Sequence, residues 1–95
     1  MPYVSEVARR HLAPYLDDLI QLLEHKNTVQ TPGELTYLLY RIMLAYLTGI
    51  NIQTGGQSYG TLSEVLACVE SAKLEFYRRK IAPYEDLKIG QNGDL

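Results

Sequence analysis

Tryptophan is absent from the sequence, and cysteine occurs once, as Cys68. A single cysteine excludes an internal disulfide framework and is typical of a protein in a reducing compartment. An excess of basic residues is also missing, since nine Lys and Arg face eleven Asp and Glu, a net charge of −2. Proteins that bind nucleic acid along their surface are usually basic. We therefore expect no bulk nucleic-acid binding.

The sequence also lacks a long apolar segment. The residues before Arg10 contain no apolar core of a signal peptide, and no uninterrupted run of about twenty apolar residues is present. We expect a cytoplasmic protein without a membrane partner. A chain of 95 residues allows one domain with one modest core.

Apolar residues and tyrosine are abundant. Hydrophobic residues make up 46% and charged residues 21% of the chain, which is the balance of a globular protein. Eight of the nine aromatic residues are tyrosine. Because tyrosine combines an apolar ring with a polar tip, it suits both half-exposed core positions and interfaces. Composition alone leaves both interpretations open.

Apolar residues recur every three or four positions in three segments, which predicts helices over about 5–25, 32–48 and 59–82. We expect an all-α fold, a small antiparallel three-helix bundle that forms a single domain over 1–95. Proline inside a helix removes a hydrogen bond, so we expect the first helix to break at Pro14. Pro83 should end the third helix and leave a polar tail over 83–95.

Turn-forming residues mark the helix ends. Thr31 and Glu34 have the spacing of a capping box at the start of the second helix. Gly49 is expected to end that helix in a left-handed conformation, followed by a glycine-rich linker over 49–60. The third helix has two candidate N-caps, Thr61 in a second capping box and Ser58 one turn earlier.

The second helix is apolar on two sides. One stripe contains Leu35, Leu38, Leu39, Ile42, Met43 and Tyr46, and the second contains Tyr37, Tyr40, Leu44 and Leu47. Its only charged residues are Glu34 and Arg41. A helix that is apolar nearly all round needs cover on several sides. We expect homo-oligomers to form through this helix, with the second stripe as the interface.

Four segments of the chain are similar to a family of short uncharacterised proteins from bacteriophages and bacteria. They are the opening MPYV, the GELTY of the second helix, the AKLEFYRR that ends the third, and the final APYEDLKI with its NGD. The resemblance implies an all-helical fold and a phage or prophage origin. It implies no activity.

No residue pattern predicts catalysis or a metal site. His11 and His25 lack partners at ligand spacing, and Cys68 is expected to be a small buried apolar residue. Glu64, Glu70 and Glu75 are six and five residues apart and so do not share one helix face. We therefore expect neither an enzyme nor a metal or cofactor site.

Tyr77, Arg78, Arg79 and Tyr84 form the strongest candidate binding cluster. Aromatic rings stack on bases, and guanidinium groups bind phosphate or carboxylate oxygens in pairs. The alternative is a solvated basic helix end, in which Glu75 pairs with Arg79 at i,i+4 and Glu85 and Asp86 balance the remaining charge.

Two functional hypotheses follow. The first is a non-enzymatic, oligomeric interaction module that binds a host or phage protein through apolar and tyrosine-rich surface. The second is a protein that holds an anionic nucleotide between subunits. The stripe on the second helix favours the first, and the basic cluster favours the second.

Overall fold

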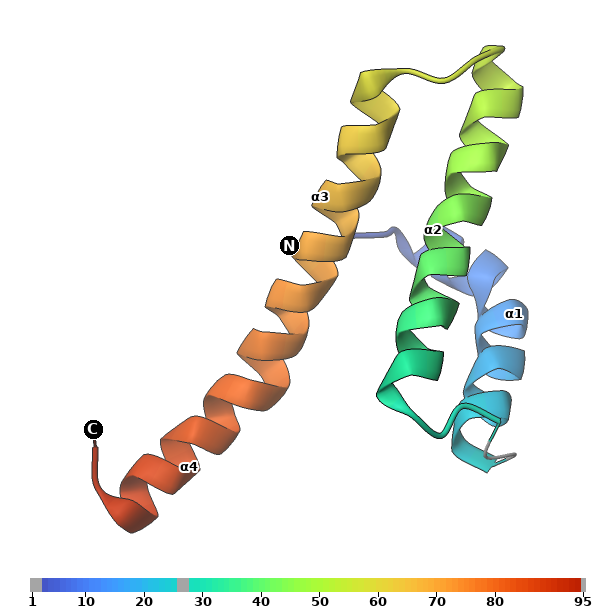
Figure 1. Cartoon of the computed structure of the whole chain (residues 1–95). Helices are drawn as coiled ribbons and strands as arrows, with labels where there is room; N and C mark the ends of the chain where they lie inside the picture. The colour runs from blue at the N-terminus through green and yellow to red at the C-terminus, as the bar shows by residue number, and fades with distance from the viewer. Residues whose placement is uncertain (1–2, 26–27, 95) are drawn as a thin grey trace. The chain divides into compact units, whose positions relative to one another are not determined.

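The computed structural model describes residues 3–25 and 28–94, and every regular element in these ranges is helical. The elements are α1 (Glu6–His25), α2 (Pro32–Thr54), α3 (Tyr59–Phe76), the π-helix η1 (Tyr77–Ile81) and α4 (Ala82–Asn92) (Figure 1). The all-α prediction is confirmed. The chain divides into two compact units, Met1–Arg41 and Ile42–Leu95, and α2 contributes to both. The three-helix bundle stays a prediction.

In the first unit, α1 runs without interruption through Pro14, so the predicted break is wrong. Ser5 caps the helix, because its hydroxyl oxygen accepts a hydrogen bond from the Ala8 N–H at 3.1 Å. Pro14 removes only the bond to the carbonyl of Arg10. Because Pro14 is exposed, water can hydrate that carbonyl, and the rest of the helix continues on both sides.

The predicted capping box at the start of α2 is confirmed. The Glu34 N–H donates to Thr31 Oγ1 at 3.1 Å, and the Thr31 N–H donates to Glu34 Oε1 at 3.0 Å. Two N–H groups that the first turn of a helix leaves unpaired are thereby satisfied. This local chemistry fixes the start of α2.

In the second unit, α2 continues to Thr54, so the predicted end at Gly49 is wrong. Gly49 lies within the helix because Ile50 continues the apolar pattern and is half-buried. The terminating glycine is Gly55, whose φ of 83° is in the left-handed region, and its N–H donates to the carbonyl of Asn51 at 2.9 Å. The linker predicted over 49–60 is therefore only the short turn between α2 and α3.

Of the two predicted caps for α3, the structure has the earlier one. Ser58 is extended, with φ −126° and ψ 155°, and its side chain accepts a hydrogen bond from the Thr61 N–H at 3.1 Å. Thr61 itself lies inside α3, so a capping box starting at Thr61 does not form. This turn joins α2 and α3 as a helical hairpin within the second unit (Figure 1).

The helical backbone also continues past Pro83, so the predicted polar tail is instead α4. Proline has no N–H and its ring clashes with the carbonyl four residues earlier. The π turn of η1 lies just before the proline and widens the helix there. The Ala82 N–H donates to the carbonyl of Tyr77, five residues back, so the backbone continues as a helix through Pro83. α4 ends at Gly93, whose φ is 86°.

None of the described residues is buried. Large apolar side chains are instead exposed on every α-helix, and the highest exposed fractions are 84% for Tyr59 and 77% for Ile52. Cys68 is exposed too, so its predicted burial is wrong. The helices therefore present apolar surface that the described chain leaves in contact with water.

α2 is also long and apolar enough to cross a membrane by length and composition, with a mean hydropathy of 1.2 over its best 18 residues. Its apolar residues are nevertheless interrupted by Arg41, so it is no uninterrupted apolar run. The core helix of a protein that stays in water meets the same criterion, so this property assigns no location.

Candidate functional site

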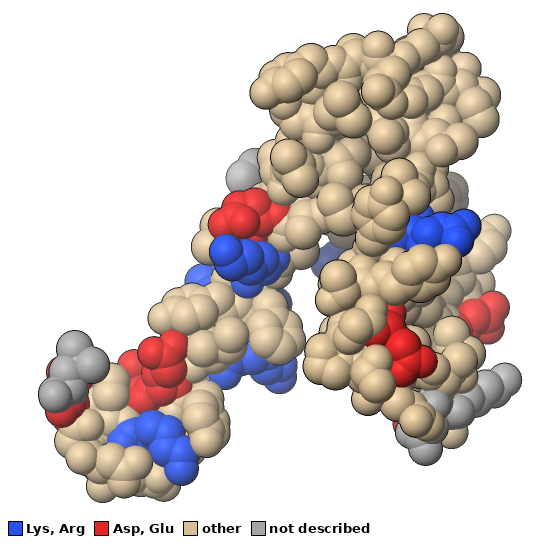
Figure 2. Space-filling view, viewed as in Figure 1, with Lys and Arg blue, Asp and Glu red and all other residues tan. Residues whose placement is uncertain are grey.

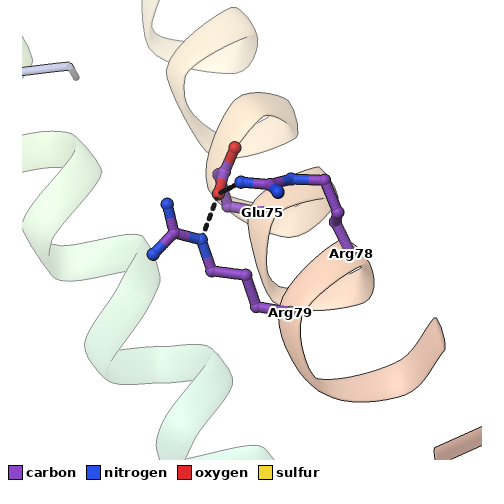
Figure 3. A network of polar contacts seen from close by, with 3 residues as sticks. All are labelled: Glu75, Arg78 and Arg79. Atoms are coloured by element: carbon purple, nitrogen blue, oxygen red, sulfur yellow. Dashed lines mark hydrogen bonds and ion pairs between the residues drawn. The ribbon is translucent and has the colours of Figure 1, made fainter. Parts of the chain in front are cut away.

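Two of the predicted site residues share one carboxylate. Arg78 Nη2 lies 2.9 Å and Arg79 Nε lies 2.7 Å from the same oxygen, Oε2 of Glu75 (Figure 3). The sequence predicted the pair with Arg79, which forms at i,i+4, and Arg78 adds a second bond at i,i+3. Glu75 is the most covered of the three, with 27% of its side chain exposed.

These contacts set the pKa of Glu75. The hydrogen bond from Arg78 lowers the pKa most, partial desolvation opposes it, and the Arg79 hydrogen bond and the charge of both arginines lower it further. The net result is a pKa below the ordinary value for glutamate. Glu75 is therefore ionised at neutral pH, and an anionic ligand would compete with it for both guanidinium groups.

The two predicted tyrosines have separate partners. The Tyr77 hydroxyl hydrogen-bonds Glu85, and this bond, together with the charges of Glu85 and Asp86 and some desolvation, raises the pKa of Tyr77. The Tyr84 ring has Lys88 Nζ at 5.5 Å from its centroid. The structure therefore divides the predicted cluster into three local groups. This arrangement resembles the balanced, solvated helix end that the sequence offered as the alternative.

The Glu75 network makes the end of α3 sensitive to acid. Because the pKa of Glu75 is lowered on folding, the network contributes stability above the unfolded-state pKa and loses it as pH falls through the lowered value. We expect NMR signals of the Arg78 and Arg79 side chains to shift on acidification, with a midpoint below 4.5, the ordinary pKa of glutamate.

The control is Glu75→Gln, which should remove this transition while keeping the size and helix propensity of the side chain. A midpoint that persists in Glu75→Gln would contradict the assignment to Glu75.

The predicted interface stripe on α2 is accessible along its length. Tyr37, Tyr40 and Leu44 have exposed fractions of 60%, 54% and 36%, and Leu47 is half-buried. Arg41 Nη1 donates to the Tyr37 hydroxyl at 2.9 Å, and its guanidinium lies 5.8 Å from the ring centroid. These contacts hold the ring of Tyr37 against α2.

A hydrophobic groove that the sequence analysis missed lies within the second unit. It has a volume of about 250 Å³ and is lined by Ile42, Met43 and Tyr46 of α2 and Val65, Cys68, Val69 and Ala72 of α3. Ile42, Met43 and Tyr46 belong to the first apolar stripe predicted for the second helix, and Val65, Val69 and Ala72 recur at helical spacing on the third. Their register against α2 could not be found from the sequence, because it depends on the turn at Gly55.

The first unit has a second hollow, which is larger and more open. Leu22, Val29, Leu38 and Tyr37 line it, together with Glu34 of the capping box. Its lining is largely apolar, like that of the groove in the second unit.

Charged residues are missing from a large part of the second unit. Residues 42–63 include no Lys, Arg, Asp or Glu, although Ile52 and Tyr59 are strongly exposed there. In Figure 2 the end of the α2–α3 hairpin accordingly shows neither acidic nor basic side chains. An uncharged surface with exposed apolar side chains is typical of a contact with another macromolecule rather than of free solvent exposure.

Within residues 3–25 and 28–94, no three His, Cys, Asp or Glu residues are grouped so that they could hold a metal ion. The surfaces that the structure does offer are apolar and tyrosine-rich.

These features define the class as a small all-helical protein whose helices present apolar side chains at the surface. The family model described as "Domain of unknown function (DUF6899)" matches residues 1–95, and the chain belongs to this family. No curated protein and no solved structure matches the chain.

Proposed function

We propose that this protein is a non-enzymatic, homo-oligomeric interaction module of phage or prophage type that acts in the cytoplasm and binds a host or phage protein. One observation carries the proposal. The described residues include many large apolar side chains and none that is buried. Apolar surface of this extent is stable in water only when another surface covers it.

The size of the two units supports self-association. Neither unit reaches about 60 residues, and chains below that size bury too little surface for a stable core without additional cover. Two apolar stripes on α2 supply the surface that another copy would cover. Burying one Leu or Ile side chain contributes roughly 1.5–3 kcal/mol. A few such residues per copy are therefore enough for stable association.

The tyrosines support a protein partner beyond the copies themselves. Tyr59 lies in the uncharged part of the second unit and is 84% exposed. Tyrosine is enriched in protein interfaces because its ring buries a large area at a low cost in conformational entropy. A neutral, aromatic surface fits a partner that offers apolar side chains and few charges.

Nucleotide binding is the alternative, and the geometry supports it less well. Arg78 and Arg79 already share Glu75, so a phosphate group must displace or outcompete that carboxylate. Tyr77 is engaged with Glu85 and does not join the two arginines in a common pocket.

Native mass spectrometry of the protein purified without added ligand tests both functions. We expect a homo-oligomer whose mass is a whole multiple of 10.8 kDa. An oligomer carrying the additional mass of a nucleotide would favour the alternative. A monomer at micromolar concentration would overturn oligomerisation, and recovery of that monomer with lipid vesicles in a flotation assay would assign the apolar surface of α2 to a membrane.

A further inference from the structure

We propose that one side of the helical segment α3–η1–α4 binds a helix of a partner protein, and that this helix carries acidic residues beside its apolar face. The inference rests on the proposed function, because it takes the partner to be a protein. It adds a contact surface separate from the uncharged residues 42–63, and it names the chemistry that this surface fits. The carrying observation is that lysines alternate with exposed apolar side chains on this side of the segment.

The surface is built from residues three or four positions apart, which are neighbours on a helix. We call it the basic stripe, and its members are Lys73, Phe76, Lys80, Tyr84, Leu87 and Lys88. All of them are exposed, and the apolar members have exposed fractions of 62% for Phe76, 59% for Tyr84 and 56% for Leu87. Because α3, η1 and α4 follow one another without a break, the stripe lies on one continuous helical path (Figure 1).

The π turn of η1 aligns the two aromatic rings of the stripe. In a regular α-helix, residues eight positions apart, such as Phe76 and Tyr84, point about 80° away from each other. The π turn takes up about one extra residue, so residues eight apart across it lie on nearly the same side. The hydrogen bond of Tyr77 with Glu85, also eight positions apart, requires the same alignment. Phe76 and Tyr84 therefore share one side of the segment, with Lys80 between them.

The lysines of the basic stripe are accessible to a partner. Within the part of the chain that the structure describes, Lys80 forms no ion pair. Lys73 contacts Glu70 at 3.5 Å, in a pair whose side chains remain 72% and 57% exposed. Exposed pairs of this kind contribute little. Lys88 donates to the neutral side chain of Gln91 and lies over the Tyr84 ring. Three basic groups along one stripe therefore complement acidic groups on a partner.

Carboxylates on both sides limit the width of the basic stripe. Glu75 directly precedes Phe76, so it lies about 100° around the axis on one side, where two arginines hold it. Glu85 directly follows Tyr84, about 100° around the axis on the other side, where it bonds the Tyr77 hydroxyl. A broad anionic surface, such as a membrane or a nucleic acid, would be repelled by these carboxylates. A single helix is narrow enough to contact the stripe alone.

The same stripe of a second copy is a poor occupant. A two-fold contact centred on Lys80 places this lysine opposite its own copy in either orientation of the helices. Like charges that meet in an interface disfavour the pairing. The spacing of three and four residues between the apolar members suits packing against a helix. The occupant that fits is therefore a helix whose apolar residues are flanked by Asp or Glu.

Two synthetic peptides serve as probes. The acidic peptide has three heptads with leucine at the a and d positions and glutamate at both flanking positions, and repulsion among the glutamates keeps it from pairing with itself. The basic peptide has lysine in place of each glutamate. In fluorescence anisotropy with the full chain, we expect the acidic peptide to bind about tenfold more tightly than the basic one. This difference should shrink at high salt.

A charge reversal within the stripe tests the role of the lysines. Lys80→Glu should weaken binding of the acidic peptide about fivefold and bring the affinities of the two peptides closer together. Arg78→Glu is the matched control, because it makes the same change of charge two residues away, on the other side of the segment. It should leave both affinities unchanged. Far-UV circular dichroism checks that both variants keep their helix content.

A pair of leucines tests the apolar part of the contact. Leu87 belongs to the basic stripe, whereas Leu74 lies two residues before Phe76 and faces away from it. Both leucines are 56% exposed, so the two truncations remove equally accessible side chains. Leu87→Ala should weaken binding of the acidic peptide about fivefold, and Leu74→Ala should leave it unchanged.

Several results would overturn the assignment. These are equal binding of the two peptides, no binding of the acidic peptide, or equal losses in Lys80→Glu and Arg78→Glu. Binding of phosphatidylserine vesicles or of a single-stranded oligonucleotide in place of the acidic peptide would assign the stripe to a broad anionic surface instead. A homo-oligomer that binds neither peptide would leave the proposed function standing. A monomer that binds the acidic peptide through the stripe would overturn oligomerisation and keep this contact.

Discussion

Leu44→Glu is expected to dissociate the proposed homo-oligomer. Leu44 lies in the middle of the α2 stripe formed with Tyr37, Tyr40 and Leu47, and it is 36% exposed in the single chain. In a two-fold contact the substitution occurs twice, and each copy loses roughly 1.5–3 kcal/mol of apolar burial. The dissociation constant should therefore rise at least about a hundredfold. Sedimentation equilibrium over a range of protein concentrations measures it.

Ala45→Glu is the matched control on the same helix. Ala45 is exposed and belongs to neither apolar stripe, because it lies about 100° around the helix axis from Leu44. A glutamate at position 45 adds the same charge and should leave the dissociation constant within about threefold of the wild-type value. Equal dissociation by both variants would show that net charge, and not the stripe, controls assembly. No dissociation by Leu44→Glu would contradict an interface on this stripe.

Val65→Asp is expected to unfold the α2–α3 hairpin. Val65 is half-buried and lines the apolar groove opposite Ile42 and Tyr46. A carboxylate in this position loses water against a lining that is mostly apolar. We expect a loss of about 2–3 kcal/mol in the free energy of unfolding. Thermal melts followed by far-UV circular dichroism measure the loss.

Ala67→Asp provides the comparison for that variant. Ala67 is exposed and lies two residues further along α3, away from the groove. Ala67→Asp measures how much an aspartate within α3 lowers the free energy of unfolding through helix propensity alone, which is below about 1 kcal/mol. If the two variants melt at the same temperature, the groove contributes nothing to the stability of the hairpin.

The starts of the helices could be predicted from the sequence, because they depend on neighbouring residues. The capping box of Thr31 and Glu34 needs only a side chain and a backbone group three residues apart. Ser58 caps α3 in the same way. Interactions between groups three residues apart can be recognised from a few consecutive residues of the sequence.

The ends of the helices could not be predicted as well, because longer-range patterns decided them. Either Gly49 or Gly55 could terminate α2. The apolar residues after Gly49 extend the helix, and it ends before Gly55, which has a positive φ. Pro14 and Pro83 are local helix breakers, yet both lie within helical backbone. At each proline the loss of one hydrogen bond is smaller than the gain from continuing the helix.

Of the contacts in the candidate site, the sequence predicted those that depend only on regular helix spacing. The pair of Glu75 and Arg79 follows from the i,i+4 spacing of a regular helix. The bond between Tyr77 and Glu85 does not follow, because the π turn of η1 shifts every later residue around the helix axis. A helical wheel that assumes 3.6 residues per turn throughout therefore assigns the residues of α4 to the wrong face.

The short turns have a consequence for the order of folding and assembly. The caps and the side-chain hydrogen bonds described above join residues at most eight positions apart, and the longest of them joins Tyr77 to Glu85. Chains dominated by such local contacts form structure in microseconds to milliseconds. Meeting a second copy is a bimolecular event whose rate scales with concentration. Dilution should therefore slow formation of the proposed homo-oligomer, and the concentration of the protein in the cell would set the fraction that is assembled.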